Sequence, residues 1–169
     1  MLILNKSLNK SLILCSLLLL ISTGCDYRFE AEPDKNDYII YQSGGGELGA
    51  SWVKIVIRGD GSVEYHGKYP YEGTWPQKEL SNTYKLSVGR TKQLFQSLID
   101  TGLFSLKDKT MHGADLPFTG ISADIDGHTL DVSWNIITDS ESDKKYTEVN
   151  VLIWKISQEM GIPEPIIHN

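Results

Sequence analysis

Residues 52–67 read WVKIVIRGDGSVEYHG, and this stretch carries the strongest signal for how the chain folds. Two β-type runs, Trp52 to Arg58 and Val63 to Gly67, flank Gly59-Asp60-Gly61, which is typical of a three-residue hairpin loop with a glycine bulge. A two-residue turn would mix the two faces, because a shift of one residue moves every side chain to the other side of the sheet. The longer loop pairs Ile57 with Val63 and Ile55 with Tyr65, and leaves Lys54, Val56, Glu64 and His66 on the opposite face.

A second hairpin is predicted from residues 121–134, ISADIDGHTLDVSW. Asp126-Gly127 is a strong signal for a two-residue type I′ turn between its strands. That turn pairs Ala123 with Leu130 and Ile121 with Val132 on one face, and Asp124 with Thr129 and Ser122 with Asp131 on the other. Both strands alternate in phase, so this hairpin should have one buried and one wet face.

Two amphipathic helices are predicted. Ser87 is a suitable N-cap for a helix over residues 88–101, and Gly102 stands where a left-handed residue ends such a helix. The second helix enters through residues 139–145, with Asp139 or Ser142 as its cap and acidic residues in its first turn, and ends at Gly161 before Pro163. Their inward stripes are Val88, Thr91, Leu94, Phe95, Leu98 and Ile99 in the first, and Tyr146, Val149, Ile153, Ile156 and Met160 in the second.

Short strands are also expected at residues 38–41 and 83–86. Prolines and a glycine confine the aromatic stretch between residues 69 and 76 to edge strands or loops. Strands joined by hairpins, with helices kept apart from them in the sequence, indicate an α+β domain. We predict an antiparallel sheet built from hairpins, with two helices packed on one face and the other face open.

The first 25 residues, MLILNKSLNKSLILCSLLLLISTGC, have the parts of an export signal. Lys6 and Lys10 give a positive start, residues 11–21 form an apolar run, and small residues precede Cys25. The pattern resembles a bacterial lipoprotein signal. In such proteins the cysteine sulfur receives a diacylglycerol and the new amino terminus is usually acylated, so the resemblance implies lipidation of Cys25 and stable anchoring. The alternative, a transmembrane anchor, needs roughly 20 apolar residues, and this run is shorter.

The signal divides the chain into residues 1–24 as signal peptide, 25–37 as lipidated cysteine with a flexible tether, and 38–169 as one domain. The whole chain has two cysteines, Cys15 in the signal and Cys25 at the lipidation position. The mature domain would therefore have no thiol for a disulfide or a zinc site. Loss of Lys6 and Lys10 takes 16 basic residues to 14 against 22 acidic ones, a formal charge of −8. This charge argues against a nucleic-acid partner, and the lipid would provide the contact with the membrane.

The domain itself resembles an uncharacterised family of exported bacterial domains. The likeness rests on residues 45–67 with their Val-Glu-Tyr-His-Gly close, on the helix that ends Asp-Thr-Gly-Leu-Phe at residues 100–104, and on Asp115-Leu116-Pro117. It extends over roughly residues 38–156. The resemblance implies an exported, accessory domain, and it supplies no activity, cofactor or site residue.

Two groups of residues are candidates for binding. Tyr69, Tyr71 and Trp75 form either an aromatic platform for a sugar or peptide, or a cap on one end of the core. On the polar faces of the two hairpins, His66 stands beside Glu64, and Asp124 lies diagonal to Asp131. These side chains are either acid and base groups or ordinary solvent-facing residues. The candidate binding residues are therefore Tyr69, Tyr71, Trp75, His66, Asp124 and Asp131, and no catalytic residue is assigned.

Metal and nucleophile motifs are weak. His112 with Asp115, and Asp124 and Asp126 with His128, place imidazole and carboxylate groups close together in the sequence. Neither set has the ligand spacing of a zinc site or a calcium loop, and the turn already accounts for Asp126. The chain has no Gly-x-Ser-x-Gly motif either. We expect no metal site and no cofactor.

The sequence therefore favours a lipid-anchored protein of the bacterial cell envelope, facing the periplasm or the exterior. It would act as a non-catalytic binding or accessory module for another envelope protein or a ligand. One alternative is an envelope hydrolase that uses carboxylates on the open sheet face. Another is an inhibitor of a secreted hydrolase, in which loop 107–115 would fill the cleft of the target.

Overall fold

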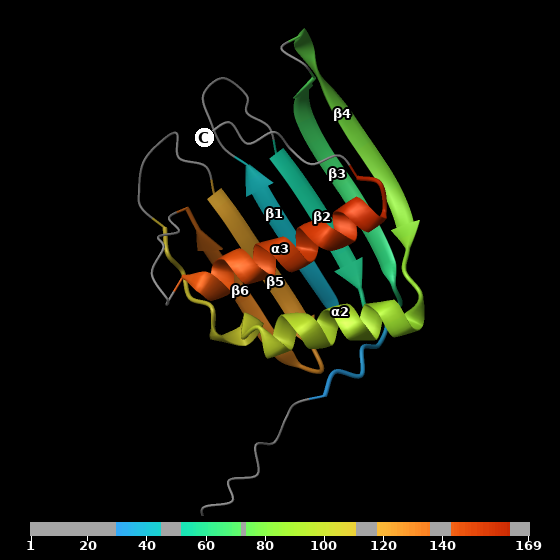
Figure 1. Ribbon diagram of the computed structural model, residues 1–169, viewed down its shortest axis with the longest axis vertical. Helices are drawn as coiled ribbons and strands as arrows, with labels where there is room; N and C mark the ends of the chain where they lie inside the picture. The colour runs from blue at the N-terminus through green and yellow to red at the C-terminus, as the bar shows by residue number, and fades with distance from the viewer. Residues whose placement is uncertain (1–29, 45–51, 72–73, 111–117, 136–142, 163–169) are drawn as a thin grey trace, which may run out of the picture.

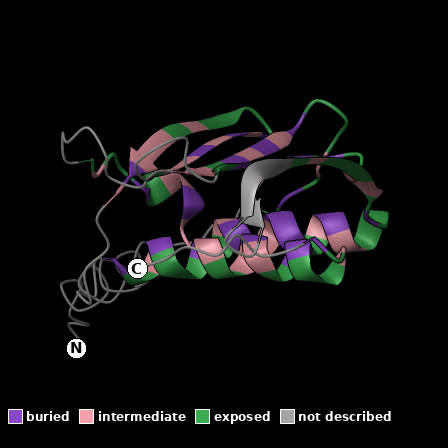
Figure 2. Cartoon of the chain, turned by 90° about the horizontal axis from the view of Figure 1, so that it is seen from above, coloured by how far each residue is buried: buried purple, intermediate pink, exposed green. Residues whose placement is uncertain are grey.

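The structure is a computed structural model that describes residues 30–44, 52–71, 74–110, 118–135 and 143–162, without the side chains of residues 69–78. Within these ranges six strands form one antiparallel sheet in the order β4-β3-β2-β1-β5-β6. Both helices cover the same face of it, with their buried sides toward the strands (Figures 1 and 2). The predicted α+β fold, an antiparallel sheet with two helices, is confirmed.

The elements follow one another closely along the chain. The strands are β1 (Tyr38–Gly44), β2 (Trp52–Arg58), β3 (Ser62–Tyr71), β4 (Thr74–Lys85), β5 (Phe118–Ile125) and β6 (His128–Trp134). The helices are α2 (Val88–Asp100) and α3 (Lys144–Glu159), with a short 3-10 helix, η1 (Leu103–Ser105), after α2.

Both predicted hairpins have the predicted register. The first pairs Ile57 with Val63 and Ile55 with Tyr65, and the second pairs Ala123 with Leu130 and Ile121 with Val132. Asp126 and Gly127 have φ angles of 50° and 76°, the left-handed conformation that a type I′ turn requires of both residues. Local alternation and turn chemistry were therefore sufficient to set these registers.

Strand β1 joins the two hairpins. It pairs antiparallel with β2 on one side and with β5 on the other over its full length. Its Ile39 and Tyr41 are buried toward the helices, where the ring of Tyr41 makes an edge contact with Trp154 of α3 at 6.0 Å between centroids. The core thus lies between the sheet and the helices, and Trp134, Tyr65 and Phe95 are the largest fully buried side chains from the other elements.

Some element boundaries differ from the prediction. Strand β4 is longer than the predicted run at residues 83–86, since it starts at Thr74 and is the edge strand, where Pro76 is tolerated. In α2 the Ser87 cap is confirmed, but Val88 is 80% exposed and does not belong to the inward stripe. Helix α3 begins only at Lys144, with Asp143 at the N-cap and no acidic residue in its first turn. The predicted caps Asp139 and Ser142 lie outside the described residues.

Residues 30–37, which we expected to belong to the tether, pack against the domain. Ala31 is fully buried in the main core cluster. Asp37 is also buried, and its side chain accepts hydrogen bonds from the amides of Asp34 at 2.8 Å and Asp126 at 3.1 Å. Its carbonyl accepts from the amide of Gly59 at 2.8 Å. We call residues 30–37 the strap, because they hold both hairpin turns together at the lower end of the sheet in Figure 1.

A glycine-to-alanine pair tests how closely the strap lies on the first hairpin. A Cβ at Gly59 would lie 1.8 Å from the carbonyl oxygen of Asp34, so Gly59→Ala must displace backbone. We expect it to lower the free energy of unfolding by about 1–3 kcal/mol, the usual cost of overpacking. Gly89→Ala is the control: its Cβ meets nothing within 4 Å on a helix, and it should be neutral or stabilising by up to about 1 kcal/mol. Urea denaturation of both variants measures the difference, and equal midpoints would contradict the packing of the strap.

Candidate functional site

The face of the sheet opposite the helices, which we call the open face, carries no described element (Figure 2). The strand registers place four rows of residues across it, three running from β4 to β6 and the uppermost from β4 to β5. The lowest row holds Lys85, Ser62, Arg58, Tyr38, Asp124 and Thr129, and the second row holds Thr83, Glu64, Val56, Ile40, Ser122 and Asp131. The third row holds Ser81, His66, Lys54, Gln42, Gly120 and Ser133. The uppermost row holds Glu79, Lys68, Trp52, Gly44 and Phe118. The middle strands β2 and β1 contribute the apolar Trp52, Val56 and Ile40, together with the polar Arg58, Lys54 and Gln42.

The charges on the open face are divided between its two halves. Strands β2, β3 and β4 present four cations, Lys54, Arg58, Lys68 and Lys85, against the carboxylates Glu64 and Glu79 among their described side chains. Strands β1, β5 and β6 present Asp124 and Asp131 and no described cation. One half of the face is therefore positive and the other negative.

The local ion pairs leave part of this charge unmatched. Arg58 pairs with Glu64, and Lys85 pairs with Asp60 in the adjoining loop, each at 3.2 Å. Hydrogen bonds from Ser62, and then Lys85, lower the pKa of Asp60 to about 2. These pairs are exposed, so each contributes little stability and remains accessible to a partner. Lys54 and Lys68 form no ion pair with any described side chain.

Two large apolar side chains stand at the upper end of the open face. Trp52 of β2 and Phe118 of β5 are 41% and 45% exposed. Both have Gly44 of β1 as their cross-strand partner, so the two rings flank a position without a side chain. Lower in the middle of the face, Val56 and Ile40 are cross-strand neighbours, although Val56 is only 6% exposed. Exposed aromatic side chains of this size are typical of a surface that receives a partner.

The predicted candidates on the two hairpins do lie on this face, but they are not brought together. His66 of β3 shares a hydrogen bond of 3.0 Å with Ser81 of β4, through its Nδ1 and the serine hydroxyl. Asp124 lies on β5, three strand spacings away, or about 14 Å. Asp131 lies one strand further and accepts a hydrogen bond from Ser122 at 2.8 Å. No single site contains the histidine and these two carboxylates.

The backbone places Tyr69 and Tyr71 at the end of β3 and Trp75 near the start of β4, in the pairing where Tyr71 meets Thr74. The register shifts between Tyr69 and Tyr71, at Pro70, which has no amide hydrogen for the ladder. The side chains of these three aromatic residues lie outside the described part of the structure, so the platform and core-cap interpretations both stay open.

The two sequence-level metal sets do not form a site within the described residues. Asp124 projects on the open face, whereas His128 pairs with Ile125 on the helix side and its ring lies 5.7 Å from that of Phe104. Asp126 accepts a hydrogen bond from the amide of Glu32 at 3.2 Å. His112 and Asp115 lie outside the described residues. Among the residues that are described, no cluster of three potential ligands is found.

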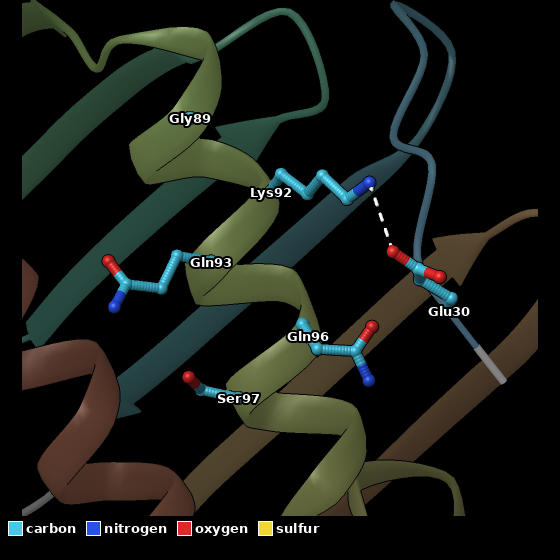
Figure 3. A pocket seen from close by; sticks show the side chains of 6 residues that line it. All are labelled: Glu30, Gly89, Lys92, Gln93, Gln96 and Ser97. Carbon is cyan, nitrogen blue, oxygen red and sulfur yellow. Dashed lines mark ion pairs between the residues drawn. The ribbon is translucent and has the colours of Figure 1, made fainter. Parts of the chain in front are cut away.

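An open hollow of about 540 Å³ lies between the strap and the outer side of α2 (Figure 3). Its lining residues are Glu30, Gly89, Lys92, Gln93, Gln96 and Ser97. Lys92 forms ion pairs with Glu32 at 2.5 Å and Glu30 at 3.3 Å, and these two carboxylates raise the pKa of Lys92, with Glu32 the larger cause. Because these charges already pair with one another, the hollow fits an attachment of the strap better than a ligand pocket.

A single glutamine completes this attachment. The side-chain oxygen of Gln96 accepts a hydrogen bond from the amide of Ala31 at 2.8 Å. One turn earlier, Gln93 points the other way and accepts from Arg90 at 2.9 Å (Figure 3). Sequence reasoning missed this contact, because it joins residues 65 positions apart and the strap has no apolar periodicity.

Comparison with known protein families and with curated protein sequences finds no match for this chain. Among the described residues, no helix is long and apolar enough to span a bilayer.

The two glutamines of α2 offer a matched test of the strap. We expect Gln96→Ala to raise the hydrogen-exchange rate of amides 30–37 by about five- to tenfold, since a hydrogen bond contributes about 1 kcal/mol. Gln93→Ala should leave those amides unchanged, because its side chain bonds only to Arg90 among the described residues. Exchange measured by mass spectrometry on peptides from this segment separates the two cases. Equal protection in both variants would show that Gln96 does not hold the strap.

Proposed function

We propose that this chain is a lipid-anchored protein of the bacterial cell envelope that acts as a non-catalytic binding module, with the open face as its binding surface. The observation that carries the proposal is the composition of that face. Exposed Trp52 and Phe118 and two oppositely charged halves occur together on a surface that no described element covers. A partner surface would bury the aromatic groups and match the charges.

The support for anchoring comes from the sequence and from the strap. Cys25 stands five residues before Glu30, the first described residue, so the lipid would be at most about 18 Å along the chain from the domain. Because residues 30–37 are bound to both hairpin turns and to α2, an anchored domain would be held near the membrane with a defined end toward it.

The hydrolase alternative has weaker support. Its best feature is the Ser81–His66 hydrogen bond, which pairs a nucleophile with a base on the exposed surface of an edge strand. The described residues provide no carboxylate bonded to His66 as the third member of a triad. For the inhibitor alternative, residues 107–110 are not a free loop, since Lys109 bonds through its backbone to Ser133 and Asn135 beside β6. The rest of that loop lies outside the described residues.

The chain supplies its own control for lipidation, because it has a second cysteine. The full-length protein should enter the detergent phase in a Triton X-114 separation and incorporate a labelled fatty acid. We expect Cys25→Ala to abolish both properties and Cys15→Ala to preserve both, since Cys15 lies within the apolar run of the signal. A native chain that stays in the aqueous phase and takes up no label would overturn the anchoring proposal.

Photo-cross-linking in living cells tests the binding surface. A photoreactive residue at Lys54, in the middle of the open face, should yield a discrete cross-linked adduct. The same residue at Lys155, exposed on α3, should yield none, although both positions lie on the same anchored chain. Equal adducts from both positions, or none from Lys54 and from Gln42 beside it, would contradict the assignment of this face.

A further inference from the structure

We propose that the occupant of the open face is a second copy of this chain, packed face to face about a twofold axis that runs parallel to the strands between β1 and β2. The inference rests on the proposed function in two respects, that the open face is the binding surface and that the chain is anchored, and it names the partner. Two sheets that pack face to face keep their strands aligned within about 30°, which this axis permits.

The division of charge selects this axis. Rotation about it places strands β2, β3 and β4 of one copy over β1, β5 and β6 of the other, so each positive half meets a negative half. A twofold axis across the strands would instead place each strand over itself and set like halves together. Charge complementarity of this kind fixes orientation, because juxtaposed like charges are strongly unfavourable.

The lowest row gives the charge match at the level of residues. In this row Arg58 of β2 and Lys85 of β4 flank Ser62 of β3. The proposed axis sets Asp124 of the partner subunit over Ser62, displaced sideways from each cation by one strand spacing of about 4.8 Å. Arg58 and Lys85 already hold exposed carboxylates of their own chain, and their remaining donors are available for the second copy.

The same axis matches shapes along the centre. Val56 of β2 would lie over Ile40 of the partner subunit, and Trp52 over Gly44 of the partner subunit. Because Gly44 has no side chain, it leaves room for an indole that is 41% exposed in the single chain. At the upper end the ammonium of Lys68 would lie over the ring of Phe118 of the partner subunit, a favourable cation–π geometry.

The face is large enough for a stable dimer. Six strands spaced about 4.8 Å apart and seven residues rising about 3.3 Å each give a face of about 29 by 23 Å. Two such faces in contact would bury about 1,300 Å² in total, within the range of roughly 1,200–2,000 Å² that specific interfaces bury.

Membrane anchoring selects the same axis independently. In each copy the strap leaves the domain at the lower end of the sheet, beside the start of β1 (Figure 1). A twofold axis parallel to the strands keeps both straps at the same end, so two lipids can enter one membrane. An axis across the strands would place the straps at opposite ends.

A charge-swap experiment tests the dimer. Two copies of the full-length chain with different affinity tags are expressed together, extracted in mild detergent and purified through one tag, and recovery of the other tag is measured. Asp124→Lys with Asp131→Lys makes the open face positive, and Arg58→Glu with Lys85→Glu makes it negative. Each double variant paired with itself should lose co-recovery by at least about tenfold relative to the native pair. The two double variants expressed together should regain native co-recovery, because each reversed half then meets its opposite.

The controls distinguish failure of the dimer from failure of the proposed binding surface or of the proposed anchoring. Lys107→Glu with Lys155→Glu changes the charge by the same amount away from the open face and should leave co-recovery unchanged. Failure of the mixed double variants to restore association, while each variant still unfolds at the native midpoint, would overturn the dimer. If native copies do not associate but Lys54 still cross-links to a different protein, the open face is still the binding surface, and the identification of its partner as a second copy is wrong. Absence of lipid label on the native chain would contradict anchoring and remove the membrane argument for the axis, whereas the charge-swap result would still decide the dimer.

Discussion

The pairing of β1 with both β2 and β5 is the constraint on which the rest of the structure depends. Without β1 the sheet divides into the three strands β2, β3 and β4 and the two-stranded hairpin of β5 and β6, and an isolated hairpin is only marginally stable in water. Insertion of β1 between them makes one sheet that is wide enough for two helices to cover. The same strand supplies Tyr41 to the helix side and Ile40 and Gly44 to the open face, so the core and the candidate surface both depend on its register.

The strap reinforces this pairing from outside the sheet. Asp37 directly precedes β1, and its carboxylate and carbonyl bind amides of the β5–β6 turn and the β2–β3 loop. These contacts hold the two hairpins at the same end of β1, where a slip of either one would break them. The described residues contain no cysteine for a disulfide, and here hydrogen bonds to the buried Asp37 link the two hairpins.

The parts of the fold that the sequence predicted are those determined by neighbouring residues. Period-two alternation and the Gly-Asp-Gly and Asp-Gly turns were enough for the hairpin registers, and a serine and a glycine were enough for the ends of α2. The strap was not predictable, because its contacts with Gln96 and Asp126 join residues 65 and 94 positions apart. The division of charge on the open face depends on strand order, which local patterns do not specify. Because the sequence does not specify strand order, His66 and Asp124 were both candidates for one binding site. In the structure His66 lies on β3 and Asp124 on β5, with β2 and β1 between them.

The strap also determines what an anchored domain could reach. With at most about 18 Å of chain between Cys25 and Glu30, the lower end of the sheet would stay close to the bilayer. That end carries the carboxylates Glu30, Glu32, Asp34, Asp60 and Asp126, and Lys92 and Lys85 already pair with three of them, so these groups give anionic headgroups no net positive charge to bind. The strands would then stand away from the membrane, with the open face turned sideways along its surface. A surface held in that direction meets other proteins anchored in the same membrane, whereas the lipid itself remains out of its reach.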